Sequence, residues 1–202
     1  MGWMDEGDTV QFSGPILAKK GCKLQIDFIE GATWTVKATP AGGAPGYEGK
    51  AYQAAKLTCT ITDEGIQTEG EHIRPRLVLE HQFNLEKYPY LDKKTGEVRW
   101  LGRQTVYDLE EAFGFEPVYV NEAGEVLVPF VTKAGRKVAP RADGVVKRLL
   151  NPEFAKAYFN ADGTVKPENW INKTVYADVE VEESEKYGDR NRIQRFRAAP
   201  VA

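Results

Sequence analysis

The sequence predicts a mixed, β-dominated fold in which a five-stranded barrel carries one helix and an α/β insertion. Several short segments alternate apolar and polar residues with period two, as strands with one buried face do. Turn residues, mainly glycine, proline and asparagine, separate these segments at regular intervals. One segment of helical periodicity lies between the third and fourth predicted strands, and this position favours a barrel over a sandwich.

The composition is typical of a single soluble domain. Of the 202 residues, 42% are hydrophobic and 28% are charged, and the formal net charge is −3. This charge argues against a uniformly basic nucleic-acid coat, but it is compatible with a local basic groove. No segment approaches the roughly 18 apolar residues of a membrane helix. No signal peptide is evident either, so we expect a cytoplasmic location.

The first predicted strand follows a polar, glycine-rich segment at residues 1–15, which we interpret as a flexible N-terminal arm. This strand covers residues 21–30 and ends at a predicted turn of Gly31 and Ala32. Residues 33–39 then form either a second strand or the continuation of the first across a bend.

Two more strands are predicted at residues 54–62 and 76–83, after a loop rich in glycine and proline at 40–49. In these strands and the first one, alternate side chains are expected to face the core. They are Cys22, Leu24, Ile26, Phe28, Leu57, Cys59, Ile61, Leu77, Leu79, His81 and Phe83. Free, buried thiols are the expected state of both cysteines.

Residues 84–100 are predicted to form a loop in which aromatic and cationic side chains are interleaved, with a turn at 94–97. The aromatic residues are Tyr88, Tyr90 and Trp100, and the cations are Lys87, Lys93, Lys94 and Arg99. Rings that stack on bases, beside charges that neutralise phosphates, are typical of single-strand binding. The alternative is an ordinary loop whose aromatic residues cover the core, with Trp100 buried at the start of the helix.

The predicted helix covers residues 105–113, with Gly114 placed to end it. The following segment, 118–171, is expected to contain a hairpin around residues 121–125 and two short helices. These helices are predicted at 144–150 and at 152–159, the second with Asn151 as its cap and Pro152 in its first turn.

The chain from 172 to 198 is predicted to form a closing hairpin of one acidic and one basic strand. The acidic residues are Asp178, Glu180, Glu182, Glu183 and Glu185, and the cations are Lys186, Arg190, Arg192, Arg195 and Arg197. The residue pattern favours cross-strand ion pairs on a solvated face, each contributing about 0.2–1 kcal/mol. The alternative is a basic strand whose arginines contact phosphate.

This hairpin carries a resemblance to a known family. The hairpin begins with a strand that starts Asn-Lys-Thr, and after a short turn it continues with Arg-Asn-Arg-Ile. This order resembles the closing hairpin of small phage proteins, often encoded beside recombination and replication genes. Those proteins are regarded as OB-fold-like single-stranded DNA-binding proteins. A helix that ends Ala-Phe-Gly-Phe also matches the family's layout. The matching residues of the hairpin are Asn172, Lys173, Thr174, Val175, Ala177, Val179, Gly188, Arg190, Asn191, Arg192 and Ile193.

The resemblance implies an OB-like five-stranded barrel with one helix between strands three and four. Members of the family pass from the helix to the closing hairpin more directly. We therefore interpret 118–171 as an α/β insertion within a single domain of residues 1–202.

No catalytic or metal site is predicted. The two histidines, His72 and His81, do not form a ligand-spaced cluster with cysteine or carboxylate. Glu48-Gly49-Lys50 superficially resembles part of a metal-dependent nuclease site, but it lies in a glycine- and proline-rich loop and no convincing aspartate precedes it. We expect a protein that is not an enzyme and that has no cofactor.

The function we expect is sequence-tolerant binding of single-stranded DNA in phage replication or recombination. The predicted DNA contacts are Lys56, Lys87, Tyr88, Tyr90, Arg99, Trp100, Tyr187, Arg190, Arg192 and Arg195. Partners implied by the resemblance are single-stranded DNA and phage replication or recombination proteins, in the host cell cytoplasm, and a homo-oligomer is compatible with the sequence. The alternative, which the net acidic charge supports, is a virion or assembly protein that uses the barrel as a protein-binding module.

Overall fold

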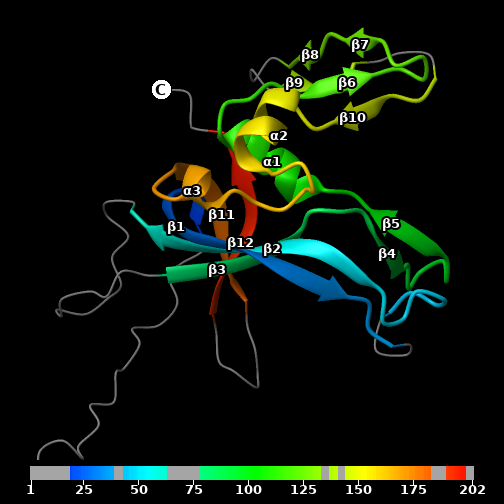
Figure 1. Cartoon of the computed structure of the whole chain (residues 1–202), viewed down its shortest axis with the longest axis horizontal. Helices are drawn as coiled ribbons and strands as arrows, with labels where there is room; N and C mark the ends of the chain where they lie inside the picture. The colour runs from blue at the N-terminus through cyan, green and yellow to red at the C-terminus, as the bar shows by residue number, and fades with distance from the viewer. Residues whose placement is uncertain are drawn as a thin grey trace, which may run out of the picture.

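The computed structural model describes residues 19–38, 43–62, 78–132, 137–140, 144–182 and 190–198. The largest element is an antiparallel five-stranded sheet with the strand order β12-β11-β1-β2-β3 (Figure 1). Its strands are β1 (Lys19–Thr35), β2 (Ala51–Ile61), β3 (Val78–Asn84), β11 (Thr174–Glu182) and β12 (Arg190–Arg197). The prediction of a β-dominated fold is confirmed. The predicted arm at 1–15 lies outside the described residues.

The two edge strands of this sheet approach each other. The ring of His81 on β3 lies 5.6 Å from the ring of Phe196 on β12, in an edge-on arrangement. In the described part of the chain, the pairing that defines the sheet does not include a ladder between β3 and β12. The sheet therefore curves back on itself without a hydrogen-bonded seam.

β1 is one long strand, so the predicted turn at Gly31 and Ala32 is wrong and the alternative, that the first strand continues past it, is confirmed as far as Thr35. The irregularity in β1 lies earlier, as a change of register between Ile26 and Phe28, where β1 pairs with β2. One extra residue there reverses the side-chain alternation. As a result Phe28, predicted to be buried, is 47% exposed, and Ile29 is fully buried in its place.

The segment predicted as a loop at 84–100 is a second, smaller hairpin. Strands β4 (Tyr88–Leu91) and β5 (Val98–Leu101) pair with each other and lie beside the far end of β1 and β2 (Figure 1). The predicted turn at its tip is present, held by the hydrogen bond from the backbone N–H of Gly96 to the carbonyl of Asp92 (2.8 Å).

Helix α1 (Gln104–Ala112) confirms the predicted helix. Its apolar stripe packs Val106 and Leu109 into the core, and Gly114 follows its end with a φ of +83°. The helix lies against β12 and β3, the two edge strands of the sheet.

The segment 118–171 has two parts. The first consists of short strand pairs formed by β6 (Val118–Val120), β7 (Val126–Leu127), β8 (Phe130–Val131), β9 (Lys137–Val138) and β10 (Lys147–Leu149). The predicted hairpin around 121–125 is confirmed. The helix predicted at 144–150 is wrong, because its last residues form β10, which pairs with β6.

The second part contains α2 (Pro152–Tyr158) and the short α3 (Pro167–Trp170). α2 was predicted, and the side chain of Asn151 accepts hydrogen bonds from the backbone N–H groups of Glu153 and Phe154, as a helix cap does. Phe154 and Trp170 are fully buried and belong to the same core as β1 and β2. This part therefore contributes to the main core, unlike the small sheets before it.

None of the helices in the part of the chain that the structure describes is long and apolar enough to cross a membrane. Both cysteines are buried free thiols, as predicted.

Candidate nucleic-acid interface

Five aromatic side chains gather where the small β4–β5 hairpin meets the far end of β1 and β2. We call Trp34, Tyr47, Tyr52, Tyr88 and Trp100 the aromatic cluster. Trp34 lies 4.5 Å from Tyr88 and 6.3 Å from Tyr52, measured between ring centroids. Trp100 lies 5.5 Å from Tyr47 and 6.5 Å from Tyr52, both edge-on. The rings thus form one contiguous surface.

The cluster is accessible to solvent. Trp100 is 50% exposed, and the other four rings are half-buried. Burial raises the pKa of Tyr88 above its ordinary value, so this tyrosine stays neutral and hydrophobic at physiological pH. Large aromatic side chains exposed together are uncommon on a soluble surface and indicate a binding site.

Strand pairing places the first two rings. Trp34 on β1 lies directly opposite Tyr52 on β2, and side chains of directly opposed residues share one face of an antiparallel pair. Alternation along β2 turns Ala55 and Leu57 into the core and Tyr52 to the outer face. In β4 and β5, Trp100 pairs with Pro89, which is fully buried.

The loop between β1 and β2 places Tyr47. The chain folds back so closely that a Cβ atom on Gly43 would lie 1.6 Å from the carbonyl oxygen of Lys37, so that a side chain does not fit there. Two hydrogen bonds then close the loop, from Gly49 to the carbonyl of Val36 and from Tyr47 to the carbonyl of Ala44 (3.0 and 3.1 Å).

Among the described residues, one cation contacts the cluster, and two more are adjacent to its residues in the sequence. The ammonium group of Lys50 lies 4.6 Å from the centre of the Tyr47 ring, a cation–π contact. Lys87 is exposed immediately before Tyr88. Arg99 is half exposed beside Trp100 and forms an ion pair with Asp92 (3.2 Å). The arrangement thus combines rings with positive charge.

The structure therefore brings together several residues that the sequence predicted as DNA contacts. Lys87, Tyr88, Arg99 and Trp100 lie in or beside the cluster, and Tyr90 is half-buried on the same hairpin, opposite Arg99. The alternative that places Trp100 in the core is wrong, because half of its surface is exposed. Tyr187 lies outside the described residues.

The predicted contacts on the basic strand form ion pairs with the acidic strand, as the residue pattern favoured. Arg195 contacts Asp178 (2.8 Å), and Arg190 and Arg192 both contact Glu182 (2.7 and 3.3 Å). Their side chains are 48–65% exposed. A role for these three arginines in phosphate binding stays a prediction.

The outer face of β1, β2 and β3 carries a second group of exposed residues. Lys56, another predicted contact, forms an ion pair with Glu80 (2.8 Å), and this contact raises the lysine pKa. Phe28 lies opposite Thr58 on the same face. This face leads along β1 and β2 to Trp34 and Tyr52.

Sequence reasoning missed Trp34, Tyr47 and Tyr52 as members of the site. A pairing register for β1 and β2 would have shown that Trp34 and Tyr52 are opposite each other, but the predicted turn at Gly31 broke that register. Nothing in the pattern indicated Tyr47, because its position depends on how the loop folds.

The structure gives no support to the nuclease interpretation of Glu48-Gly49-Lys50. The Glu48 carboxylate accepts a hydrogen bond from the backbone N–H of Gly46 (2.8 Å), and Lys50 lies over Tyr47. Among the described residues, no group of three or more histidine, cysteine or acidic side chains is arranged to hold a metal ion.

Comparison of the chain with protein-family models, curated protein sequences and solved structures gives no match.

Proposed function

We propose that the protein binds single-stranded nucleic acid through the aromatic cluster, without strong sequence preference. The observation that carries the proposal is the contiguous set of five partly exposed rings, with Lys50 against Tyr47 and with Lys87 and Arg99 adjacent in sequence to Tyr88 and Trp100. Every base presents a flat π surface, so stacking on such rings is sequence-tolerant. The nearby cations neutralise phosphates along the strand.

An OB-like assignment of the main sheet supports this proposal. The strand order β12-β11-β1-β2-β3, with α1 between β3 and β11, is the order that a five-stranded OB-like barrel would have if β3 and β12 closed it. In that fold the loop between the first two strands and the face of strands two and three bind oligonucleotides. The cluster lies at the first of these places, and Phe28 on β1 lies on the same outer face as Lys56 of β2, next to the second.

The geometry also suggests a path for the strand. Phe28 and Trp34 are six residues apart on β1, which corresponds to about 20 Å along an extended strand. A single strand that stacks on the cluster would reach Phe28 across the outer face. In this proposal the protein serves phage replication or recombination, as the resemblance of the closing hairpin implies.

A direct test compares single-stranded and duplex DNA. Fluorescence anisotropy with labelled oligothymidine and with a duplex of equal length, each at two salt concentrations, should show tighter binding of the single strand and weaker binding at higher salt. Equal affinity for both forms, or no binding at low salt, would remove the proposal.

A second candidate function is a protein-binding module of a virion or an assembly complex. The small sheets of 118–171 expose several apolar side chains, which are 55–85% accessible: Val126, Val128, Phe130, Val131 and Val145. Exposed apolar groups of this kind favour a protein partner. If this candidate is correct, substituting Val128 and Phe130 with serine should abolish binding of the protein partner. The same substitutions should not change DNA binding.

A further inference from the structure

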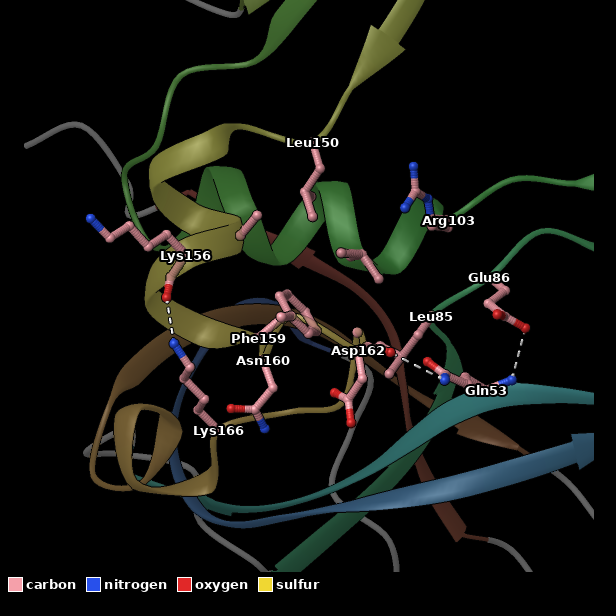
Figure 2. Close-up of a pocket in the computed structure, with 14 residues that line it drawn as sticks. Gln53, Leu85, Glu86, Arg103, Leu150, Lys156, Phe159, Asn160, Asp162 and Lys166 are labelled. Atoms are coloured by element: carbon pink, nitrogen blue, oxygen red, sulfur yellow. Dashed lines mark hydrogen bonds between the residues drawn. The ribbon is translucent and has the colours of Figure 1, made fainter.

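A pocket of about 730 Å³ opens between the main sheet and the second part of 118–171 (Figure 2). Its walls come from β2, the start of α1, α2 and the chain between α2 and α3. The volume lies within the range of small-molecule sites. The pocket does not include any ring of the aromatic cluster.

The inner surface of the pocket is apolar. It is formed by Leu85, Val106, Leu150 and Phe159, and Leu150 and Phe159 are only partly buried. The Phe159 ring packs edge-on against Phe154 and Trp170, with centroids 5.8 and 5.7 Å away. These contacts fix the orientation of a flat, accessible ring.

The rim of the pocket carries amide groups that both donate and accept hydrogen bonds. The Gln53 side chain donates to the carbonyl of Asp162 (3.5 Å), and a Cβ atom on Gly163 would lie 3.2 Å from the Gln53 amide oxygen. The glycine, with a φ of +82°, therefore lets the turn approach β2. Asn160 donates to Thr164 and Val165, and within the described residues its amide oxygen has no recorded donor.

Cations outnumber carboxylates around the pocket, with Arg103, Lys156 and Lys166 against Glu86 and Asp162. Glu86 accepts a hydrogen bond from the backbone N–H of Gln53 (3.1 Å), and Asp162 accepts from Thr164. Arg103 does not form an ion pair with any described residue, and its guanidinium lies 5.8 Å from the centre of the Tyr107 ring. Lys166 adds a second cation, which donates to the carbonyl of Lys156 (2.7 Å).

The pocket combines an apolar surface and a fixed ring with amide groups at its edge and an unpaired guanidinium. This combination suits a planar heterocycle that carries an anionic group. We propose that this pocket binds one nucleotide, with its base against Phe159 and Leu150 and its phosphate near Arg103. The segment 118–171 supplies Phe159 and Asn160, so this segment would contact the nucleotide.

The nucleotide has two sources, a free mononucleotide or one unit of a bound strand. Tyr52 of the cluster precedes Gln53 of the pocket in β2, and neighbouring side chains of a strand point to opposite faces. A strand would therefore pass around β2 to reach both. Only this second version rests on the function proposed above.

The test is a titration of ¹⁵N-labelled protein with thymidine monophosphate up to about 5 mM, followed by NMR. We expect shifts of the side-chain amides of Gln53 and Asn160 and of the backbone N–H of Gly163. The indole N–H groups of Trp34 and Trp100 report separately on the aromatic cluster. Shifts confined to these two indoles, or no shifts at all, would overturn the proposal.

Two variants locate the site. Ala155→Leu fills the pocket from α2 with a good helix former and should weaken nucleotide binding at least about tenfold, whereas Ala155→Ser keeps the volume and should bind normally. Arg103→Gln should weaken thymidine monophosphate but not thymidine. Its matched control is Lys156→Gln, because the Lys156 amine points away from the pocket in Figure 2.

The outcomes separate the two sources. If Ala155→Leu weakens both thymidine monophosphate and oligothymidine, the pocket holds a unit of the strand; if only the mononucleotide is weakened, the ligand is free. Binding of thymidine monophosphate by the wild-type protein, without any binding of oligothymidine, would contradict the function proposed above and not the pocket. Unchanged mononucleotide affinity in both Ala155→Leu and Arg103→Gln would overturn the pocket.

Discussion

Trp100 is the residue whose environment distinguishes a binding surface from a core. Its ring is half exposed and lies edge-on to two other partly exposed rings, Tyr47 and Tyr52. We expect Trp100→Ala to weaken oligothymidine binding about five- to a hundredfold, the usual effect of losing one stacking ring. Its melting temperature should stay close to that of the wild type, because little buried surface is lost.

Val98→Ala is the matched control, since Val98 lies two residues earlier on β5 and is 36% exposed. It should bind DNA as the wild type does. A Trp100→Ala protein that melts much earlier, with an affinity that merely follows unfolding, would show that this ring supports the fold instead.

Asp178 determines part of the acid sensitivity of the fold. Its side chain is only 3% exposed. Burial alone would raise its pKa, but contacts with Arg197 and Arg195 and a hydrogen bond from the backbone N–H of Gly21 (3.0 Å) outweigh burial and hold the pKa below its ordinary value.

A lowered pKa in the folded state means that the ionised carboxylate stabilises the fold at neutral pH. This contribution is present above the unfolded pKa of about 3.9 and is lost as the pH falls through the folded value. Asp178→Asn should therefore be less stable than wild type at pH 7, and the difference should shrink below about pH 4. Urea unfolding at both pH values measures this. A constant difference would contradict the assignment.

At the scale of elements, the small sheets are attached to α1 by a buried ion-pair network. Arg148 on β10 contacts Glu110 (3.2 Å) and Glu111 (2.8 Å) on α1, and its guanidinium lies 4.4 Å from the centre of the Tyr107 ring. Glu110 is fully buried and also accepts a hydrogen bond from the backbone N–H of Asn151 (2.7 Å).

Removal of Arg148 should therefore be costly. Arg148→Met leaves the Glu110 carboxylate without its cation, which typically costs about 3–5 kcal/mol of unfolding free energy. Adding Glu110→Gln should restore much of this loss, and chemical denaturation of the single and double variants measures both. Burial already raises the pKa of Glu110, so the single variant should regain stability as acidification protonates this group. Additive effects of the two substitutions would contradict the coupling.

The sequence predicted most of the elements, and its errors have local causes. Period-two alternation identified β2, β3 and β11, and the cap of Asn151 with Pro152 identified α2. Phe28 was placed on the wrong face because a single extra residue in β1 reverses the alternation, and a single sequence does not show such a bulge. β10 was mistaken for a helix because three residues are too few to show a period.

The candidate site was predicted only in part. Tyr88, Trp100, Lys87 and Arg99 came from the interleaving of rings and cations in one segment. Trp34 and Tyr52 come from strands whose pairing brings them beside that segment, so only the tertiary structure unites them.

At the scale of the whole molecule, the two groups of cations should differ in their effect on DNA binding. Lys50 contacts the Tyr47 ring and Lys87 is exposed immediately before Tyr88, whereas Arg190 and Arg192 are paired with Glu182. We expect the double variant Lys50→Gln and Lys87→Gln to lower the salt dependence of oligothymidine binding by a slope of about 0.7 for each lost phosphate contact.

The matched control is the double variant Arg190→Gln and Arg192→Gln, which removes the same formal charge from the closing hairpin. Its slope should equal that of the wild type. If instead the slope is lowered only in the arginine variant, the phosphate contacts lie on β12.

In the function proposed above, a single strand lies on the aromatic cluster. Ultraviolet cross-linking of oligothymidine to the wild-type protein, followed by mass-spectrometric mapping of the modified residues, tests it most directly. The cross-links should fall on Trp34, Tyr47, Tyr52, Tyr88 and Trp100, with Phe28 joining them only for longer oligomers. Cross-links confined to the closing hairpin or to the small sheets of 118–171, with the five rings unmodified, would contradict it.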